Sequence, residues 1–283
     1  MDDTNFETLL GMALEEDLGG IGDVTSRAIF SDEDGCTAVL TSKDTGILCG
    51  IRRFEQVFRR VDPSVRIDLS AADGDRLSPG MEIARAAGPT RSILEAERTA
   101  INFLSFLSGI ATSASEYVRA AGDRGRAVVL DTRKTLPGYR SLSKYAVRVG
   151  GGANHRMGLY DMVLIKDNHI DATGGIPRAV ERARSRWGRR FRIEVECRTV
   201  DEVRQAVEAG ADIVMLDNMA YENARKALDL REQGVQFEAS GGISLDTAGE
   251  WSALGVDYLS VGRLTHSVRA FDFSLTILKD GAP

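Results

Sequence analysis

RIEVECRTVDEVRQAVEAGADIVML, residues 192–216, has the pattern of a strand, a helix and a second strand. Short apolar, β-branched runs at 192–195 and 213–216 predict the strands. Between them, Thr199 and Glu202 have the spacing of a capping box, and apolar residues then recur at helical period up to Gly210. Two strands joined by such a helix run parallel, so this unit predicts part of a parallel sheet.

The same alternation continues through the C-terminal half of the chain. The other short apolar runs lie at 127–130, 162–165, 235–237 and 257–261. With the two runs above they make six strands, and the last four begin about 22 residues apart, as repeating β/α units do. A parallel sheet joined by helices has to be covered on its outer face. We therefore predict an open or closed α/β barrel, with six clear strands rather than eight.

The N-terminal part has a different pattern, in which strands are followed by one long amphipathic helix. The strands are expected at 37–48, 65–69 and 82–86, and the helix at 92–121 with Ser92 and Glu95 as its capping signal. We therefore expect two domains, an N-terminal one over 1–115 and the barrel over 116–283, and we leave open that the final segment packs back on the first domain.

Composition excludes several classes of protein. The 283-residue chain has a formal net charge of -6, whereas a nucleic-acid-binding protein is usually basic. No run of 18 apolar residues occurs, and the acidic, polar N-terminus is unlike a signal peptide. Cys36, Cys49 and Cys197 form no CxxC pair. We expect a cytoplasmic protein that binds neither nucleic acid nor membrane.

Ligands of α/β barrels bind at the carboxyl ends of the strands, so the residues after each run are the candidates for function. Each of the six ends carries polar residues or glycine: DTRK at 131–134, KDNH at 166–169, Glu196, Asp217 with Asn218, SGG at 240–242, and Gly262 with Arg263. At any single end, a solvated loop charge explains the residue equally well. Six such ends together predict a ligand-binding rim.

The strand ends differ in the charge of their side chains. From Thr132 to Lys166 the chain has seven Lys or Arg residues and a single acid, Asp161, which predicts a cationic pocket for an anionic substrate. Glu196 and Asp217 suit Mg²⁺ bridged to a polyphosphate, or hydrogen bonds to sugar hydroxyls. The alternative is that these two carboxylates only neutralise Lys166 inside the barrel.

The last two strand ends predict a phosphate site. ASGGIS at 239–244 and SVGRLTHS at 260–267 are rich in glycine, which lets the backbone approach an oxyanion ahead of a helix N-terminus. All three histidines, His155, His169 and His266, lie in the segments of the rim. No spacing fits a zinc site. Anion binding is expected of His155, and a structural role is an open alternative for His169.

Several long motifs resemble the quinolinate phosphoribosyltransferase family. They are ALEEDLGGIGDVTS at 13–26, ERTAINFLSFLSGIAT at 97–112, DTRKTLPGYRSLSKYAVRVGGGANHRMGLYDMVLIKDNHI at 131–170, EAGADIVMLDN at 208–218, EASGGI at 238–243 and GVDYLSVGRLTHS at 255–267. The resemblance covers nearly the whole chain. It implies a type II phosphoribosyltransferase fold, in which a mixed α/β sandwich domain precedes an incomplete α/β barrel. It also implies a homodimer whose sandwich domain closes the partner's active site, with higher assembly left open.

The resemblance implies roles for individual residues. It assigns the binding of the quinolinate carboxylates to Arg133, His155, Arg156 and Lys166, with Arg98 reaching in from the other subunit. Lys134 would contact both substrates, Glu196 and Asp217 would hold ribose hydroxyls and Mg²⁺, and the 5′-phosphate would lie on Ser240, Gly241, Gly242 and Gly262. Thr132, Arg263 and His266 complete the predicted substrate-binding set, and Lys134, Lys166, Glu196 and Asp217 are the predicted catalytic residues. Arg263 and Tyr139 depart from the family's usual small and aliphatic residues, and their roles are open.

The predicted function is therefore transfer of the phosphoribosyl group of phosphoribosyl pyrophosphate (PRPP) to quinolinate, with decarboxylation to nicotinate mononucleotide, in de novo NAD biosynthesis. No protein nucleophile is needed, and no nucleophile elbow, P-loop or dinucleotide fingerprint occurs. Three alternatives are open: a molybdenum-operon paralogue of the same fold with another substrate, a Schiff-base aldolase that uses Lys166, and a non-catalytic sensor of phosphorylated metabolites.

Overall fold

The computed structural model describes residues 3–278. The chain divides into two compact units. Unit 1 comprises residues 1–113, 136–151 and 267–283, and unit 2 comprises residues 114–135 and 152–266. The first change of unit lies beside the expected boundary near residue 115. The return of 136–151 to unit 1 was not anticipated from the sequence.

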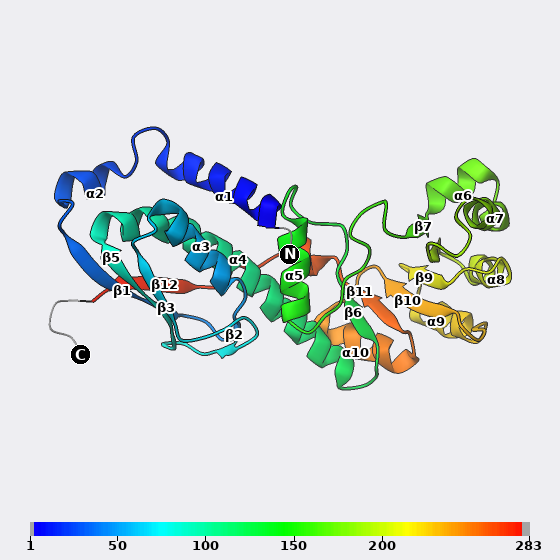
Figure 1. The fold of residues 1–283 in the computed structure, drawn as a ribbon. Helices are drawn as coiled ribbons and strands as arrows, with labels where there is room; N and C mark the ends of the chain where they lie inside the picture. Colours follow the sequence, from blue (N-terminus) through cyan, green and yellow to red (C-terminus); the bar gives the residue numbers. More distant parts are fainter. Residues whose placement is uncertain (1–2, 279–283) are drawn as a thin grey trace. The chain divides into compact units, whose positions relative to one another are not determined.

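Unit 1 is built on a four-stranded antiparallel sheet in the order β12-β1-β5-β3 (Figure 1). In that order the strands are Phe273–Ile277, Gly35–Ser42, Glu82–Pro89 and Arg66–Leu69. A separate pair joins β2 (Gly46–Ile47) to β4 (Arg76–Leu77). The helices of this unit are α1 (Asp3–Leu18), α2 (Val24–Ile29), α3 (Ile51–Val61), α5 (Arg140–Val149) and most of α4 (Thr90–Gly122).

Helix α4 begins before the position that the sequence indicates, and Ser92 and Glu95 do not cap it. Because the helix starts at Thr90, both residues lie inside its first turns. Ser92 Oγ donates to Asp62 Oδ2 at 2.7 Å, and Glu95 Oε1 accepts the backbone N–H of Asp23 at 3.3 Å. The capping prediction is wrong, because these side chains bind other segments instead of the free N–H groups of their own helix.

The strand predicted at 37–48 is two strands in the structure. β1 ends at Ser42, whose hydroxyl donates to the Asp44 carbonyl at 2.7 Å where the chain turns toward β2. The edge strand β12 was not predicted. It pairs antiparallel with β1, with Ala38 opposite Ile277. The final segment of the chain therefore belongs to the sheet of unit 1.

Unit 2 contains a six-stranded parallel sheet in the order β6-β11-β10-β9-β8-β7. In that order the strands are Val128–Leu130, Tyr258–Ser260, Gln236–Ser240, Ile213–Asp217, Ile193–Cys197 and Val163–Ile165. All six predicted strands are confirmed, with ends shifted by a few residues. The helices of this unit are α6 (Asp167–Thr173), α7 (Ile176–Trp187), α8 (Val200–Glu208), α9 (Tyr221–Leu228), α10 (Leu245–Leu254) and α11 (Arg263–His266). Helices α7 to α10 lie outside the strands that they connect (Figure 1).

The barrel is incomplete, because its terminal strands β6 and β7 do not pair with each other in the described chain. Residues 153–156, here called the seam segment, lie between them. Ala153 N–H donates to Val129 O at 2.8 Å, and Asp131 N–H donates to Ala153 O at 3.2 Å, which attaches the segment to β6. Arg156 Nη1 donates to Met162 O, directly before β7, at 3.0 Å. An irregular segment thus occupies the place of a strand.

Two expectations from composition, on membrane-spanning segments and on the cysteines, can be compared with the structure. No helix among residues 3–278 has both the length and the apolar character needed to span a bilayer. The three cysteines are free, with Cys49 and Cys197 buried and Cys36 partly exposed.

The predicted capping box of α8 is confirmed and gives a stability test. Thr199 Oγ1 accepts the N–H of Glu202 at 3.1 Å, and Glu202 Oε2 accepts the N–H of Thr199 at 3.2 Å. Thr199→Ala should lower the free energy of unfolding by about 1 kcal/mol, and Thr199→Ser, which keeps the oxygen, should not. Urea titration followed by circular dichroism measures both variants. Equal stability of the two variants would contradict a capping role.

Candidate active site

The carboxyl ends of the parallel strands surround a cavity of about 340 Å³ within unit 2. This volume is in the range of small-molecule sites. The cavity is lined by Thr132, Arg133, Lys134, His155, Arg156, Leu164, Lys166, Glu196, Met215, Asp217, Ser240 and Ser260. All of these except Leu164, Met215 and Ser260 belong to the set predicted from the sequence. Strand ends that are distant in the chain therefore meet at one site.

Arg133 and Arg156 form a cationic wall of the cavity. Arg156 is only 8% exposed, and its Nη1 is fixed by the carbonyl of Met162. Burial lowers the pKa of Arg156, and the nearby Arg133 guanidinium lowers it further. Two cations that repel each other beside a small cavity are stabilised by an anion between them, and guanidinium groups bind carboxylates through paired hydrogen bonds.

Lys166 stands at the junction of β7 and α6 and is paired with Glu196. Its Nζ lies 2.8 Å from Glu196 Oε2, and the lysine side chain remains 45% exposed. The backbone N–H of Lys166 donates to His169 Nδ1 at 2.9 Å, which holds the first turn of α6. His169 thus has the structural role that the sequence left open, and it places Lys166 at the cavity.

Glu196 and Asp217 end the neighbouring strands β8 and β9, and both line the cavity. Asp217 Oδ2 accepts a hydrogen bond from Asn218 Nδ2 at 2.9 Å, which leaves Oδ1 for another ligand. The two side chains offer only oxygen donors, the type that Mg²⁺ prefers. Mg²⁺ is commonly held by one or two carboxylates together with substrate phosphates, so these residues fit that ion.

Glycine is required where β10 ends. Gly241 has φ of +95°, and a Cβ atom at this position would collide with Oδ1 of Asn218. Asn218 itself has a positive φ of 48°, and its N–H donates to Ser240 O at 2.8 Å. The ends of β9 and β10 are therefore interlocked, and an added side chain would force them apart.

Gly262 is the second close approach of the predicted phosphate site. A Cβ atom there would lie 3.2 Å from Cδ of Lys134 and 3.2 Å from Cδ2 of His266. Thr265 Oγ1 donates to Lys134 O at 2.8 Å, so α11 fixes the backbone that carries this lysine. The structure therefore gathers Gly262, Lys134 and His266, as the sequence predicts.

Six predicted residues are absent from the lining of the cavity: Gly241, Gly262 and His266, described above, and Gly242, Arg263 and Arg98. Gly242 follows Gly241 with φ of +62° and has open space where a side chain would be. Arg263 is exposed and lies beside the Tyr117 hydroxyl, where it opposes the rise in the Tyr117 pKa that burial causes. Arg98 is exposed on α4 and belongs to unit 1, whereas the cavity is lined by unit 2.

Beside the cavity lies a buried cluster that the sequence analysis missed. His155 Nε2 is 3.1 Å from Glu194 Oε2 and 3.7 Å from Glu238 Oε2. Both glutamates are fully buried, and burial raises the pKa of each carboxyl. A signal was present: Glu194 precedes Glu196 by two residues, and Glu238 precedes Ser240 by two. Side chains two residues apart in a strand share one face, so both glutamates point toward the interior of the barrel.

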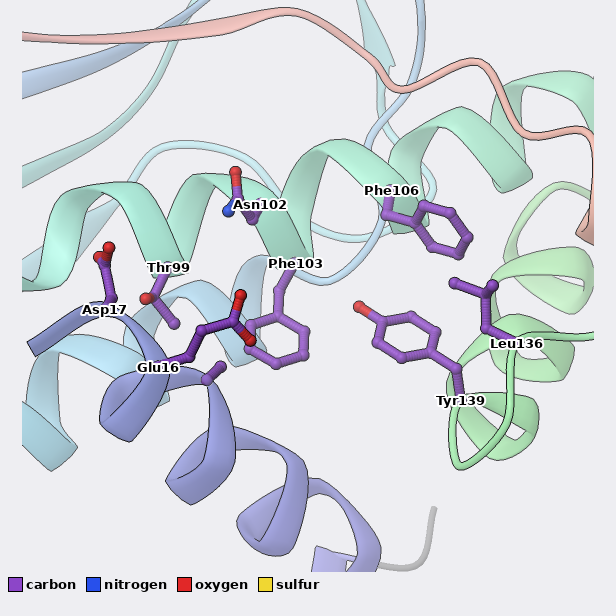
Figure 2. Close-up of a pocket in the computed structure, with 9 residues that line it drawn as sticks. Glu16, Asp17, Thr99, Asn102, Phe103, Phe106, Leu136 and Tyr139 are labelled. Atoms are coloured by element: carbon purple, nitrogen blue, oxygen red, sulfur yellow. The ribbon is translucent and has the colours of Figure 1, made fainter. Parts of the chain in front are cut away.

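Unit 1 has a separate cavity of about 290 Å³ (Figure 2). The Tyr139 ring stacks 6.0 Å from Phe103 and lies edge-on 5.1 Å from Phe106, and its hydroxyl points into the cavity. Glu16 and Asp17 supply the charged groups, and no Lys or Arg among the described residues lines this cavity. Anionic substrates therefore match the cavity of unit 2, and Tyr139 has a packing role.

Gly241→Ala should raise the KM for the phosphate-bearing substrate predicted to bind at this strand end about tenfold or more, because the added methyl group separates the ends of β9 and β10. Gly234→Ala is the matched control, since Gly234 has a similar φ of +92° but open space where the methyl group would go. Steady-state kinetics with both variants measures the effect. Equal KM values for the two variants would show that only backbone strain, and not the collision with Asn218, matters at Gly241.

Family models and relatives identify the family of this chain. The C-terminal domain model of quinolinate phosphoribosyl transferase matches residues 110–276, and the N-terminal domain model matches residues 23–108. A probable nicotinate-nucleotide pyrophosphorylase (carboxylating) of Bacillus subtilis is 43% identical, over 98% of this chain and 95% of the relative. A quinolinate phosphoribosyltransferase of Nicotiana tabacum is 40% identical, over 95% of this chain and 81% of its own.

Solved structures give the same result. The crystal structure of NadC from Streptococcus pyogenes has a TM-score of 0.93 and 40% identity, and 99% of each chain is covered. A nicotinate-nucleotide pyrophosphorylase from Francisella tularensis has a TM-score of 0.93 and 37% identity, with 98% of each chain covered. These likenesses confirm the predicted fold class. The chain belongs to the quinolinate phosphoribosyl transferase family.

Proposed function

We propose that this chain is a pentosyltransferase that joins quinolinate to PRPP and yields nicotinate mononucleotide, pyrophosphate and carbon dioxide, a step of de novo NAD biosynthesis. The relatives above carry the names of this activity. The observation that carries the proposal is the division of one cavity into a cationic wall, Arg133 and Arg156 with Lys166, and a carboxylate edge, Glu196 and Asp217. Quinolinate has two adjacent carboxylates, and PRPP has a ribose between two phosphate groups.

The cationic wall binds and orients quinolinate. A guanidinium group meets a carboxylate in a planar fork, so Arg133 and Arg156 fix the direction of the pyridine ring as well as its charge. With the carboxylates held, the ring nitrogen is directed at C1 of the ribose. Holding both reactants in one orientation supplies much of the rate increase when no protein nucleophile is used.

The bond from C1 to the pyrophosphate oxygen breaks as the pyridine nitrogen forms its bond to C1. Pyrophosphate leaves with the electron pair, and positive charge develops on the ribose. Lys134 is placed to stabilise the leaving group, and the carboxylates of Glu196 and Asp217 stabilise the sugar cation. When bound to these carboxylates, Mg²⁺ would neutralise charge on the pyrophosphate.

The product of that step is a pyridinium that carries both carboxylates. The bond between C2 and its carboxylate then breaks, carbon dioxide leaves, and the electron pair stays at C2 beside the positive nitrogen. A proton adds at C2 and gives nicotinate mononucleotide. The protein's part in this step is electrostatic, because the ring nitrogen itself accepts the developing charge.

Two of the alternatives are less well supported by the site. A Schiff-base aldolase uses a desolvated lysine, whereas Lys166 is 45% exposed and paired with Glu196. A sensor of phosphorylated metabolites does not need the carboxylate edge, yet Glu196 and Asp217 are both present in the cavity.

Incubation with quinolinate, PRPP and magnesium should yield nicotinate mononucleotide and carbon dioxide in equal amounts. Excess chelator should abolish turnover, and added magnesium should restore it, because Glu196 and Asp217 offer only hard oxygen ligands. Glu196→Gln should lower kcat about a hundredfold. Thr199→Ser, outside the site, is the control. No product from the wild-type protein would refute the proposed activity, and full activity in excess chelator would refute the metal.

We also propose that the protein is a cytoplasmic homodimer in which Arg98 completes the partner's site. Arg98 is exposed on α4, and its guanidinium lies near enough to Glu97 to lower the pKa of that carboxyl. The alternative pairing with Glu95 is not supported, since Glu95 lies 3.6 Å from Arg27 and accepts the N–H of Asp23. An exposed arginine has a guanidinium group that can also bind an anion brought by another molecule.

Complementation tests this arrangement. Arg98→Ala and Lys166→Ala should each be inactive, and mixing them after mild dissociation should restore about a quarter of wild-type activity, because mixed dimers have one intact site. Arg85→Ala, which removes an exposed arginine paired with Glu82, is the control and should stay active. If mixed dimers form, as shown by mass spectrometry, and activity does not return, Arg98 does not act in the partner's site.

A further inference from the structure

The ring nitrogens of His155 both face protein groups. Nδ1 accepts the backbone N–H of Arg156 at 2.7 Å. A neutral imidazole that accepts at Nδ1 carries its proton on Nε2. Nε2 is the atom that lies 3.1 Å from Glu194 Oε2 and 3.7 Å from Glu238 Oε2. Nε2 therefore faces two buried carboxyl groups, from β8 and β10, at ion-pair distance.

The same three residues resemble a metal site, but the tautomer argues against one. One ligand atom from each of His155, Glu194 and Glu238 lies within 4.8 Å of the others. A metal would have to bind Nε2, because Nδ1 is occupied by the N–H of Arg156. In the tautomer that this contact favours, Nε2 carries the ring proton and is not available as a metal ligand.

Two fully buried carboxyl groups are costly, so their presence calls for an explanation. Among the described residues, neither oxygen of Glu194 nor Oε1 of Glu238 forms a hydrogen bond with good geometry, so the approach of His155 to Glu194 is an electrostatic contact. Apolar residues of similar volume would fill this layer of the barrel at no such cost. The neighbouring inward-facing residues Leu164 and Met215 are of that kind.

We propose that Glu194 and Glu238 are positioning residues for quinolinate binding: their carboxyl groups attract the Nε2 side of the His155 ring and so fix the seam segment, residues 153–156. The link to the substrate is short, because the other nitrogen of the same ring accepts the N–H of Arg156. Asp131 Oδ1 fixes the segment from the β6 side by accepting the N–H of His155 at 3.0 Å. The braced segment presents the Arg156 guanidinium to a quinolinate carboxylate.

This inference rests on the proposed function, and kinetics separates it from simple core packing. Glu194→Met keeps the volume and removes both oxygens, whereas Glu194→Gln keeps an acceptor for the ring proton. Glu194→Met should raise the KM for quinolinate about tenfold or more while the KM for PRPP stays within about twofold. Glu194→Gln should stay within about threefold of wild type for both substrates. Glu238→Met and Glu238→Gln repeat the comparison if Glu194→Met does not fold.

Ile213→Val is the control for a disturbed core. Ile213 is buried and lies opposite Glu194 in the parallel register, and it carries no titratable group itself. It should lose stability without a change in the KM for quinolinate. Nitrogen NMR of the ring, simple with three histidines, should show the proton of His155 on Nε2 in the wild type and an averaged ring in Glu194→Met.

The outcomes divide cleanly. If the KM for quinolinate stays within about threefold of wild type in both methionine variants, the proposal is overturned. A parallel rise in the KM for PRPP also overturns it. So does an equal rise of the quinolinate KM in the glutamine and methionine variants, because the acceptor oxygen would then not matter. If the wild type makes no nicotinate mononucleotide, the proposed function fails. The NMR comparison still decides whether the glutamates hold the ring.

Discussion

The open seam between β6 and β7 is the constraint on which the site depends. A closed parallel barrel would satisfy the backbone of both strands by pairing them, and its wall would then consist of strands alone. Here the backbone of β6 bonds to Ala153 instead, and an irregular segment completes the wall. Irregular backbone can turn side chains in directions that a strand cannot. The seam therefore allows His155 to point inward and Arg156 to line the cavity from neighbouring positions.

An irregular segment in a barrel wall lacks the regular backbone hydrogen bonds that make paired strands rigid. The structure compensates with polar contacts from three sides: Asp131 on the β6 side, Met162 O before β7, and the carboxyl groups of Glu194 and Glu238 from within. Each contact involves a charged group or a group sequestered from water, where electrostatic interactions are stronger than at the surface. Burying two carboxyl groups costs free energy, and in return the Arg156 guanidinium is held in a fixed position.

The sequence predicted the barrel well because its signals are local. Apolar runs of strand length, the capping box at Thr199 and glycines after the last strands each follow from a few neighbouring residues. The failures involve contacts between distant segments. Ser92 and Glu95 have the spacing of a cap, but Asp62 and the N–H of Asp23 compete for them. The return of 136–151 to unit 1 has no local signature. Glu194 and Glu238 were passed over because they precede strand ends, although their two-residue spacing from Glu196 and Ser240 placed them on the same face.

The order of strands around the barrel determines where each kind of functional side chain lies. The ends beside the seam carry Arg133, Lys134 and Lys166, the next ends carry Glu196 and Asp217, and the glycines follow β10 and β11. Because β11 pairs with β6, the glycine end of β11 returns to Lys134, as the close approach of Gly262 to that lysine shows. The proposed substrate PRPP has phosphate groups at both ends of a sugar, and this cyclic order would offer glycine backbone to one phosphate, carboxylates to the sugar and lysine to the other. The seam segment then adds Arg156 beside Arg133, which follows β6, so two guanidinium groups line one cavity.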